Sequence, residues 1–329
     1  MNKINLGLIG LGTMGKVHLE NCLRLQNANL IAASDTSLKA LKMAKRLGVQ
    51  KVYRDYNDLL RKSDVDAVII ALPQYLHLES FVAAAENHKH ILIEKPLARN
   101  ASEGTVLVSA AKRYNVRAMV GYPLRFCDSF RKLRSRLLKG ELGEIQIAYA
   151  SNISDGPFTH RAFTNAPMPV PEWWWKKELT GGGALLDLGS HMIDLARWYF
   201  GNVISAKCLL GYRYDLEQED YAICLLRFKS GQSVVITTGW FSQEARTKCE
   251  LYGTAGQDSA TFQRLLSKKE KALELLLGRP SWYVLPFLYE IQYFVDCLVK
   301  DRQPEPSCES ALNDLEVIGT AYANQIDLK

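Results

Sequence analysis

The segment from Gly181 to Asp194 carries a group of side chains that can move a proton. Asp187 and His191 are four positions apart, and a helix or a tight turn leading into one would place both on the same side as Asp194. A histidine positioned by a carboxylate is a competent base for the proton of an alcohol. Three glycines precede the group, which suits backbone that passes close to a ligand. The structural alternative is that Asp187 caps a helix and His191 lies in the core.

A second proton-transfer group is Lys95, in the sequence Glu94-Lys95-Pro96. It follows one apolar run, as Leu72-Pro73-Gln74-Tyr75-Leu76-His77 follows another. If the two runs are adjacent parallel strands, both loops leave carboxyl ends, which is where an open parallel sheet binds ligands. Without that framework, Lys95 would be an exposed lysine in a turn set by Pro96.

The first expected strand leads into a glycine-rich turn, Gly10-Leu11-Gly12-Thr13-Met14-Gly15. In such a turn the glycines allow a sharp bend, close approach of backbone to a pyrophosphate and close helix-to-strand packing, while the helix N-terminus faces the phosphates. Asp35 closes the second strand, where its carboxylate can accept hydrogen bonds from the adenosine ribose hydroxyls. An aspartate repels a ribose phosphate and no arginine follows closely, so NAD is favoured over NADP. The alternative is a structural turn with a helix-capping Asp35.

Strand-like and helix-like runs alternate through the first 121 residues. The expected strands are Ile4–Ile9, Leu30–Ser34, Val65–Ala71, His90–Ile93 and Arg117–Val120. The expected helices are Gly15–Leu25, Leu38–Leu47, Leu78–Asn87 and Ser102–Tyr114. Continuous apolar strands separated by helices predict a doubly wound α/β (Rossmann) domain, because parallel strands need helical crossovers.

Beyond Tyr122 the pattern changes to β-rich runs with short connections, which predict an open, mostly antiparallel sheet in an α+β domain. The runs are Tyr221–Phe228, Ser233–Trp240 and Lys248–Tyr252, the first two joined by a hairpin turn at Ser230-Gly231. Helical spacing follows in Leu288–Val299 and Glu309–Asn324. We expect two domains, 1–123 and 124–329, with the final helix returning to the first.

A long loop-like segment, residues 155–180, contains four prolines and the run Trp173-Trp174-Trp175-Lys176-Lys177. Loops of this length are commonly lids or binding loops. Trp174 and Trp175 could stack on a sugar ring, and His160, Arg161 or Lys176 could meet an anionic group. At least one tryptophan is expected to be a packing anchor, because three in a row cannot all face one ligand.

The composition excludes several classes of protein. With 329 residues, of which 47% are hydrophobic and 23% charged, the chain is expected to be a globular protein of two domains. The net charge of +6 is modest and no expected helix carries a dense basic face, so nucleic-acid binding is disfavoured. No signal peptide or membrane-spanning run is expected. The seven scattered cysteines, with no C-x-x-C pair, indicate a reducing cytoplasm and no metal site.

The glycine turn, the Leu72 and Glu94 loops, Arg125-Phe126 and the Gly181–Asp194 motif resemble the Gfo/Idh/MocA family of oxidoreductases. The resemblance covers nearly the whole chain. It implies that Lys95 lies beside the nicotinamide and the substrate hydroxyl, and that Asp187 and His191 complete the catalytic set. In the family the peptide bond between this lysine and the following proline, here Pro96, is commonly cis. Implied cofactor contacts are Gly10, Gly12, Thr13, Met14, Gly15, Asp35, Leu72, Pro73, His77, Glu94, Lys95 and Arg125; substrate candidates are Asp194 and the loop residues named above. His77 is either a cofactor-side residue or only the first residue of a helix.

The resemblance implies an NAD(P)-dependent oxidoreductase that acts on a secondary alcohol or ketone of a sugar, an inositol-like polyol or a nucleotide sugar. One alternative is a glycoside hydrolase that uses bound NAD for transient oxidation. Another is a cofactor-sensing regulatory protein, which an intact set of Lys95, Asp187 and His191 counts against. In relatives the open sheet commonly builds an oligomer, so a homodimer or homotetramer through this sheet is expected.

Overall fold

The chain forms two compact units in the computed structural model. The structure describes residues 3–156, 158–160, 168–242, 245–262 and 284–326, with the single residues 268, 272 and 276. The first unit comprises Met1–Ala98, Ser102–Pro123 and Arg264–Leu312. The second comprises Arg99–Ala101, Leu124–Gln263 and Asn313–Lys329.

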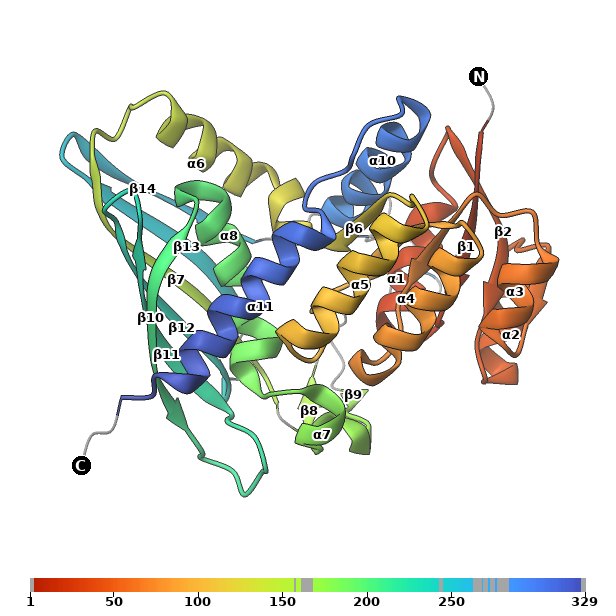
Figure 1. The fold of residues 1–329 in the computed structure, drawn as a ribbon, viewed down its shortest axis with the longest axis horizontal. Coiled ribbons are helices and arrows are strands. Elements are labelled where there is room, and N and C mark those ends of the chain that lie inside the picture. The colour runs from red at the N-terminus through yellow and green to blue at the C-terminus, as the bar shows by residue number, and fades with distance from the viewer. Residues whose placement is uncertain are drawn as a thin grey trace. The chain divides into compact units, whose positions relative to one another are not determined.

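A six-stranded parallel sheet is the centre of the first unit, with the strand order β3-β2-β1-β4-β5-β6. This is the order of a doubly wound dinucleotide-binding sheet, and the strand order reverses between β1 and β4. The predicted fold of this unit is therefore confirmed. Its strands are β1 (Ile4–Ile9), β2 (Ala28–Ser34), β3 (Lys51–Tyr53), β4 (Ala67–Ile70), β5 (His90–Glu94) and β6 (Ala118–Gly121). Of these, β1, β2 and β6 are labelled in Figure 1.

The register of this sheet aligns the carboxyl ends of its central strands. Ile9 at the end of β1 pairs with Ser34 at the end of β2 and with Ile70 at the end of β4. Ile70 in turn pairs with Ile93 of β5. The loops that follow these positions, which begin with residues such as Gly10 and Asp35, therefore leave the sheet side by side at its carboxyl edge.

Helices connect the parallel strands of the first unit. They are α1 (Thr13–Cys22), α2 (Leu38–Arg46), α3 (Tyr56–Lys62), α4 (His77–Glu86) and α5 (Ala101–Arg113). The Ser37 and Asp55 side chains accept backbone N–H groups at the starts of α2 and α3, as N-caps do. From the later part of the chain, α10 (Leu285–Val299) packs against α1 and β1. The last helix, α11 (Cys308–Ala323), begins in the first unit and continues in the second.

A mixed six-stranded sheet forms the second unit, in the order β10-β11-β12-β7-β13-β14. Only the β12–β7 pair is parallel. The helices α6 (Asp128–Leu138) and α8 (Ser190–Phe200) pack on β14 and on β7 and β12 respectively (Figure 1). The strands are β7 (Ile145–Ser154), β10 (Val203–Gly211), β11 (Tyr221–Phe228), β12 (Ser233–Trp240), β13 (Arg246–Gly253) and β14 (Gly256–Thr261).

The differences between predicted and observed elements have local causes. The bounds of β1, β11 and β12 match the prediction, and the hairpin turn is confirmed by a bond from the Gly231 N–H to the Phe228 carbonyl. Elements that were not predicted include β3, α3, β7, β10 and β14. Two of these are too short to show a period, and the three strands expose many side chains on one face, which hides an apolar run. All seven cysteines are buried thiols. Among the described residues, none of the helices has the length and apolarity required to cross a bilayer.

Candidate functional site

The glycine turn leaves the N-terminus of α1 open to an anion. Gly10 has a φ of +92°, and an added Cβ would lie 2.4 Å from the Ala71 carbonyl oxygen. A Cβ at Gly15 would lie 2.1 Å from the Gly10 carbonyl oxygen, whereas one at Gly12 would meet no described atom within 4 Å. No side chain among the described residues caps α1, and its first turn holds no acid. These features fit a dinucleotide diphosphate, which would accept from the first N–H groups of the helix.

The Asp35 carboxylate, at the end of β2, hydrogen-bonds the backbone of this turn. One carboxylate oxygen accepts the Leu11 N–H at 2.7 Å, and the other accepts the Ser37 N–H at 2.7 Å. Each oxygen keeps a second lone pair, so the carboxylate can also accept ribose hydroxyls. Asp35 therefore shapes the turn as well as offering acceptors, a role that sequence reasoning did not assign to it.

His77 joins the two loops that leave β4 and β5. It is the first residue of α4, and its ring is buried. Nδ1 lies 3.0 Å from the Pro96 carbonyl oxygen, and Nε2 lies 3.0 Å from the Leu72 carbonyl oxygen. Burial lowers the pKa of His77, although these carbonyl groups oppose that effect. The observed contacts of His77 are with backbone rather than with solvent.

Lys95 follows the end of β5 and is half-buried. The bond between Lys95 and Pro96 is cis, in agreement with the resemblance. The preceding Glu94 is buried, and its side chain contacts His18 of α1. Lys95 therefore stands at the same sheet edge as the glycine turn and Asp35, and beside the Leu72 loop.

In the second unit, Asp187 lies in a π-helical turn, Leu185–Gly189, that leads directly into α8. One oxygen of the buried Asp187 accepts the indole N–H of Trp240 at 3.1 Å. Wider turns of this kind leave backbone carbonyls for other donors and often occur at functional sites. The side chains of Thr238, Asn152 and Ser190 donate to the carbonyls of residues 184, 188 and 187. His191, at the second position of α8, is half-buried.

The three glycines before this turn are required by packing within the protein. A Cβ at Gly182 would lie 2.4 Å from the Tyr322 hydroxyl, and one at Gly183 would lie 1.9 Å from the Glu219 carbonyl oxygen. The Glu219 carboxylate accepts the N–H groups of Gly183 and Leu185 and the Tyr322 hydroxyl. Burial raises the pKa of Glu219, against the opposing effect of these donors. The observed reason for the glycines is thus close contact with protein rather than with a ligand.

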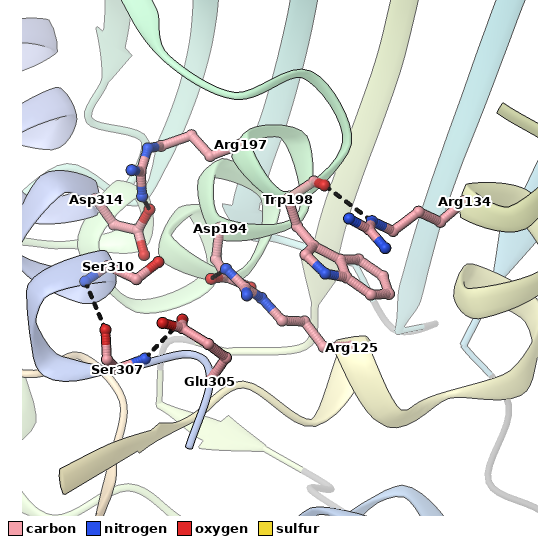
Figure 2. A network of polar contacts seen from close by, with 9 residues as sticks. All are labelled: Arg125, Arg134, Asp194, Arg197, Trp198, Glu305, Ser307, Ser310 and Asp314. Atoms are coloured by element: carbon pink, nitrogen blue, oxygen red, sulfur yellow. Dashed lines mark hydrogen bonds and ion pairs between the residues drawn. The ribbon is translucent and has the colours of Figure 1, made fainter. Parts of the chain in front are cut away.

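Arg125 and Asp194, predicted as cofactor and substrate residues, bind each other. Nε and Nη2 of Arg125 donate to the two Asp194 oxygens at 2.9 and 2.6 Å, a bidentate pair that is buried on both sides (Figure 2). Arg197 of α8 pairs with Asp314 of α11 nearby in the same network. The Trp198 ring lies under the guanidinium groups of both Arg125 and Arg134. Both oxygens of Asp194 accept a hydrogen bond, which makes the burial of its charge tolerable, whereas Oδ2 of Asp314 accepts none from the described residues.

The tryptophan run forms a short helical turn, Glu172–Trp175, followed by α7 (Lys177–Thr180). Trp174 contacts the Trp240 ring, with centroids 6.2 Å apart, while Trp175 contacts Phe158. The two rings therefore have different aromatic neighbours. Lys176 is exposed. The backbone of His160 belongs to the short strand β8 (Thr159–His160), and Arg161 lies outside the described residues.

The predicted residues fall into two groups, one in each unit. The glycine turn, Asp35, the Leu72 loop, His77 and Lys95 share one sheet edge of the first unit. Asp187, His191 and the Arg125–Asp194 pair belong to the second. The joint action of Lys95 and His191 stays a prediction. Within the described residues, three or more metal-ligating side chains do not cluster anywhere.

Sequence reasoning missed Trp240, Glu219 and His18. Trp240 bonds Asp187 across 53 positions of the chain, and Glu219 bonds Gly183 across 36. His18 reaches Glu94 from 76 positions away. Each of these contacts joins residues that are far apart in the chain, so no local pattern of the sequence relates the partners.

Comparison with known proteins agrees with this geometry. The family model described as "Oxidoreductase family, NAD-binding Rossmann fold" matches residues 4–122. The model described as "GFO/IDH/MocA C-terminal domain" matches residues 130–257.

Individual relatives match over much of the chain. Myo-inositol 2-dehydrogenase of Thermotoga maritima is 31% identical over 240 residues, which cover 71% of this chain and 67% of that protein. The scyllo-inositol 2-dehydrogenase (NAD(+)) of Bacillus subtilis is 25% identical over 337 residues, or 98% and 94% of the two chains. The crystal structure of scyllo-inositol dehydrogenase from Lactobacillus casei, with NAD(H) and scyllo-inositol, has a TM-score of 0.80 at 22% identity, with 98% and 97% coverage. This last likeness shows the same fold.

The buried Asp314 predicts a specific pH dependence of stability. Burial first, and then the nearby Asp194 charge, raise the pKa of Asp314 to about 7. A carboxyl whose pKa is raised by folding stabilises the protein at low pH, and this contribution is lost as the pH rises through about 7. Relative to Asp314→Asn, which cannot titrate, the wild type should thus lose several degrees of melting temperature between about pH 5 and about pH 8.

Differential scanning calorimetry across this range measures the effect. Asp64→Asn, at a side chain that is 91% exposed, is the matched control and should follow the wild-type curve. A difference between wild type and Asp314→Asn that is flat, or that grows in favour of the wild type with rising pH, would contradict the assignment.

Proposed function

The chain belongs to the Gfo/Idh/MocA family of oxidoreductases, whose N-terminal domain binds NAD, and on that premise we propose its substrate and catalytic residues. It is an NAD-dependent oxidoreductase that acts on a CH–OH group. The proposed substrate is a secondary alcohol or ketone of an inositol-like polyol, a sugar or a nucleotide sugar. Relatives named as myo-inositol and scyllo-inositol dehydrogenases support this class.

The observation that carries the proposal is the edge of the parallel sheet in the first unit. The open N-terminus of α1, the Asp35 carboxylate and Lys95 follow the aligned ends of β1, β2 and β5. One ligand that lies along this edge can be held at its diphosphate and its ribose while its far end reaches Lys95. We propose that residues 1–123 form the dinucleotide-binding domain and residues 124–329 the substrate and oligomerisation domain.

Each proposed residue has a separate task. Bound NAD supplies the acceptor for a hydride from the carbinol carbon. The backbone of Gly12, Thr13 and Met14 binds the diphosphate, and Asp35 binds the ribose. Lys95 lies beside the reacting hydroxyl and holds or moves its proton. His191 is the second residue proposed to accept or donate that proton. Asp187, whose carboxylate accepts the Trp240 indole N–H, orients the imidazole.

The tryptophan loop is the proposed substrate wall. Trp174 and Asp187 both contact Trp240, so an aromatic surface borders the proposed catalytic carboxylate. Apolar ring faces suit the C–H side of a sugar or polyol ring. Lys176 is exposed on the same loop and is the proposed contact for an anionic group.

Loss of the Lys95 amine is the direct test of the proposed chemistry. Lys95→Met should lower kcat by about 10²- to 10⁴-fold, because proton transfer by a positioned group contributes that much, while NAD affinity is largely kept. NADH absorbance with a panel of inositols, sugars and nucleotide sugars measures turnover, and fluorescence titration measures binding. Lys62→Met, at an exposed lysine of α3, is the control. Wild-type turnover in Lys95→Met would remove Lys95 from the mechanism.

Asp35 should set the preference for NAD. Asp35→Ala is expected to weaken NAD by about tenfold and NADP by less, because the ribose acceptor is lost together with the charge that repels a ribose phosphate. Asp55→Ala removes another carboxylate that accepts a backbone N–H in the same unit and should leave both affinities unchanged. Calorimetric titration with each nucleotide gives the two dissociation constants. An equal loss for NAD and NADP would assign Asp35 to the turn alone.

The exposed face of the second-unit sheet is the proposed oligomer interface. Large apolar side chains are exposed on neighbouring strands of this face, and Tyr149 packs edge-on against Tyr252. Members of this apolar face are Ile147, Tyr149, Ile223, Leu225 and Tyr252. Leu225→Glu should lower the molar mass found by light scattering from that of a dimer or tetramer, because it buries a charge in the interface. Leu138→Glu on α6 is the control; an unchanged mass for Leu225→Glu would exclude this face.

A further inference from the structure

A buried imidazole–carboxylate pair lies directly behind the proposed catalytic lysine. Nε2 of His18, in α1, lies 2.7 Å from Oε1 of Glu94, at the end of β5. We propose that His18 is a positioning residue, which fixes the Glu94 carboxylate and through it the backbone of Lys95. This inference rests on the proposed function, because it assigns a role toward Lys95.

The Glu94 carboxylate connects His18 to the Lys95 backbone. Its second oxygen, Oε2, accepts the Lys95 N–H at 3.2 Å. Oε1 of Glu94 thus contacts His18 of α1, the helix that follows the glycine turn, and Oε2 accepts the backbone N–H of Lys95. A shift of Glu94 would therefore move the start of the Lys95 side chain relative to the diphosphate-binding turn.

The contact with Glu94 indicates which nitrogen of the imidazole donates. A carboxylate can only accept, so Nε2 carries the hydrogen. In the part of the chain that the structure describes, Nδ1 of His18 has no hydrogen-bond partner, and the ring is 1% exposed. Within the described residues, the contact with Glu94 is therefore the only hydrogen bond of the imidazole.

The aromatic packing around His18 provides no hydrogen-bond partner for its ring. The edge of the Phe287 ring, from α10, packs on the imidazole with centroids 5.8 Å apart. An apolar side chain of similar volume would fill this place without burying a polar group. The hydrogen bond from His18 to Glu94 is the feature that an apolar side chain could not provide.

The segment after Lys95 is held independently by His77. This second imidazole lies 3.0 Å from the Pro96 carbonyl oxygen and 3.3 Å from that of Leu97. The loop is thus fixed before the lysine through Glu94 and after it through backbone carbonyls. Small displacements of a catalytic group can reduce the rate strongly, which gives the His18 contact a kinetic consequence.

Two substitutions separate the hydrogen bond from the volume of the ring. His18→Met removes the donor and keeps an apolar side chain of similar size, whereas His18→Gln carries an amide N–H at about the distance of Nε2. We expect His18→Met to lower kcat by about 10- to 100-fold, with NAD affinity kept within about threefold, and His18→Gln to retain most of kcat. The assay is NADH formation with the panel compound that the wild type oxidises fastest.

Hydrogen exchange provides a readout that does not need turnover. The Lys95 amide donates to Glu94, so its exchange rate should rise by about tenfold in His18→Met and stay near wild type in His18→Gln. Leu19→Ala, at a buried neighbour in the same helix, is the control: it should lower the melting temperature without a comparable loss of kcat. If His18→Met does not fold, His18→Asn replaces it, because its shorter amide does not reach Glu94.

Each result decides the assignment. Wild-type kcat in His18→Met, equal losses in His18→Met and His18→Gln, or an equal loss of kcat in Leu19→Ala would overturn the role of the hydrogen bond. Lys95→Met separates this failure from that of the proposed function. If Lys95→Met abolishes turnover and His18→Met does not affect it, only the positioning role is wrong.

Discussion

The level ends of the parallel strands are the constraint on which the first half of the site depends. Hydrogen bonding between β1, β2, β4 and β5 fixes their register, so the residues that follow must leave the sheet along one edge. This brings the glycine turn, Asp35 and Lys95 to the same edge of the parallel sheet. Cross-connections then refine the arrangement: Asp35 holds the turn, His77 ties two loops together and His18 holds the residue before the lysine.

The second unit meets a different requirement, which is the burial of charged groups at a non-standard helix start. The π-helical turn that carries Asp187 has its carbonyls bonded by side chains from the sheet, and the Trp240 indole bonds the carboxylate. Beside it, the Arg125–Asp194 pair is satisfied on both oxygens. These contacts limit the freedom of Asp187 and of the first turn of α8, so His191 projects from a rigid support rather than from a loop.

The sequence was most informative where local pattern decides the structure. Apolar runs predicted the parallel sheet, and the glycine spacing with Asp35 predicted the dinucleotide turn, because these depend on residues close in the chain. The three-residue β3 and the half-exposed β7 were not predicted, since neither has a continuous apolar period. The bond from Trp240 to Asp187 joins residues that no local pattern relates, and the reason for Gly183 became visible only with Glu219 beside it.

We propose that Lys95 and His191, which belong to different units, both act on the hydroxyl group of one substrate carbon. A crystal structure of the protein with NADH and the best polyol or sugar substrate tests it most directly. We expect Lys95 Nζ and an imidazole nitrogen of His191 each to lie about 3 Å from the same substrate oxygen, whose carbon is about 3–3.5 Å from nicotinamide C4. A complex in which either side chain is directed away from that oxygen would contradict it.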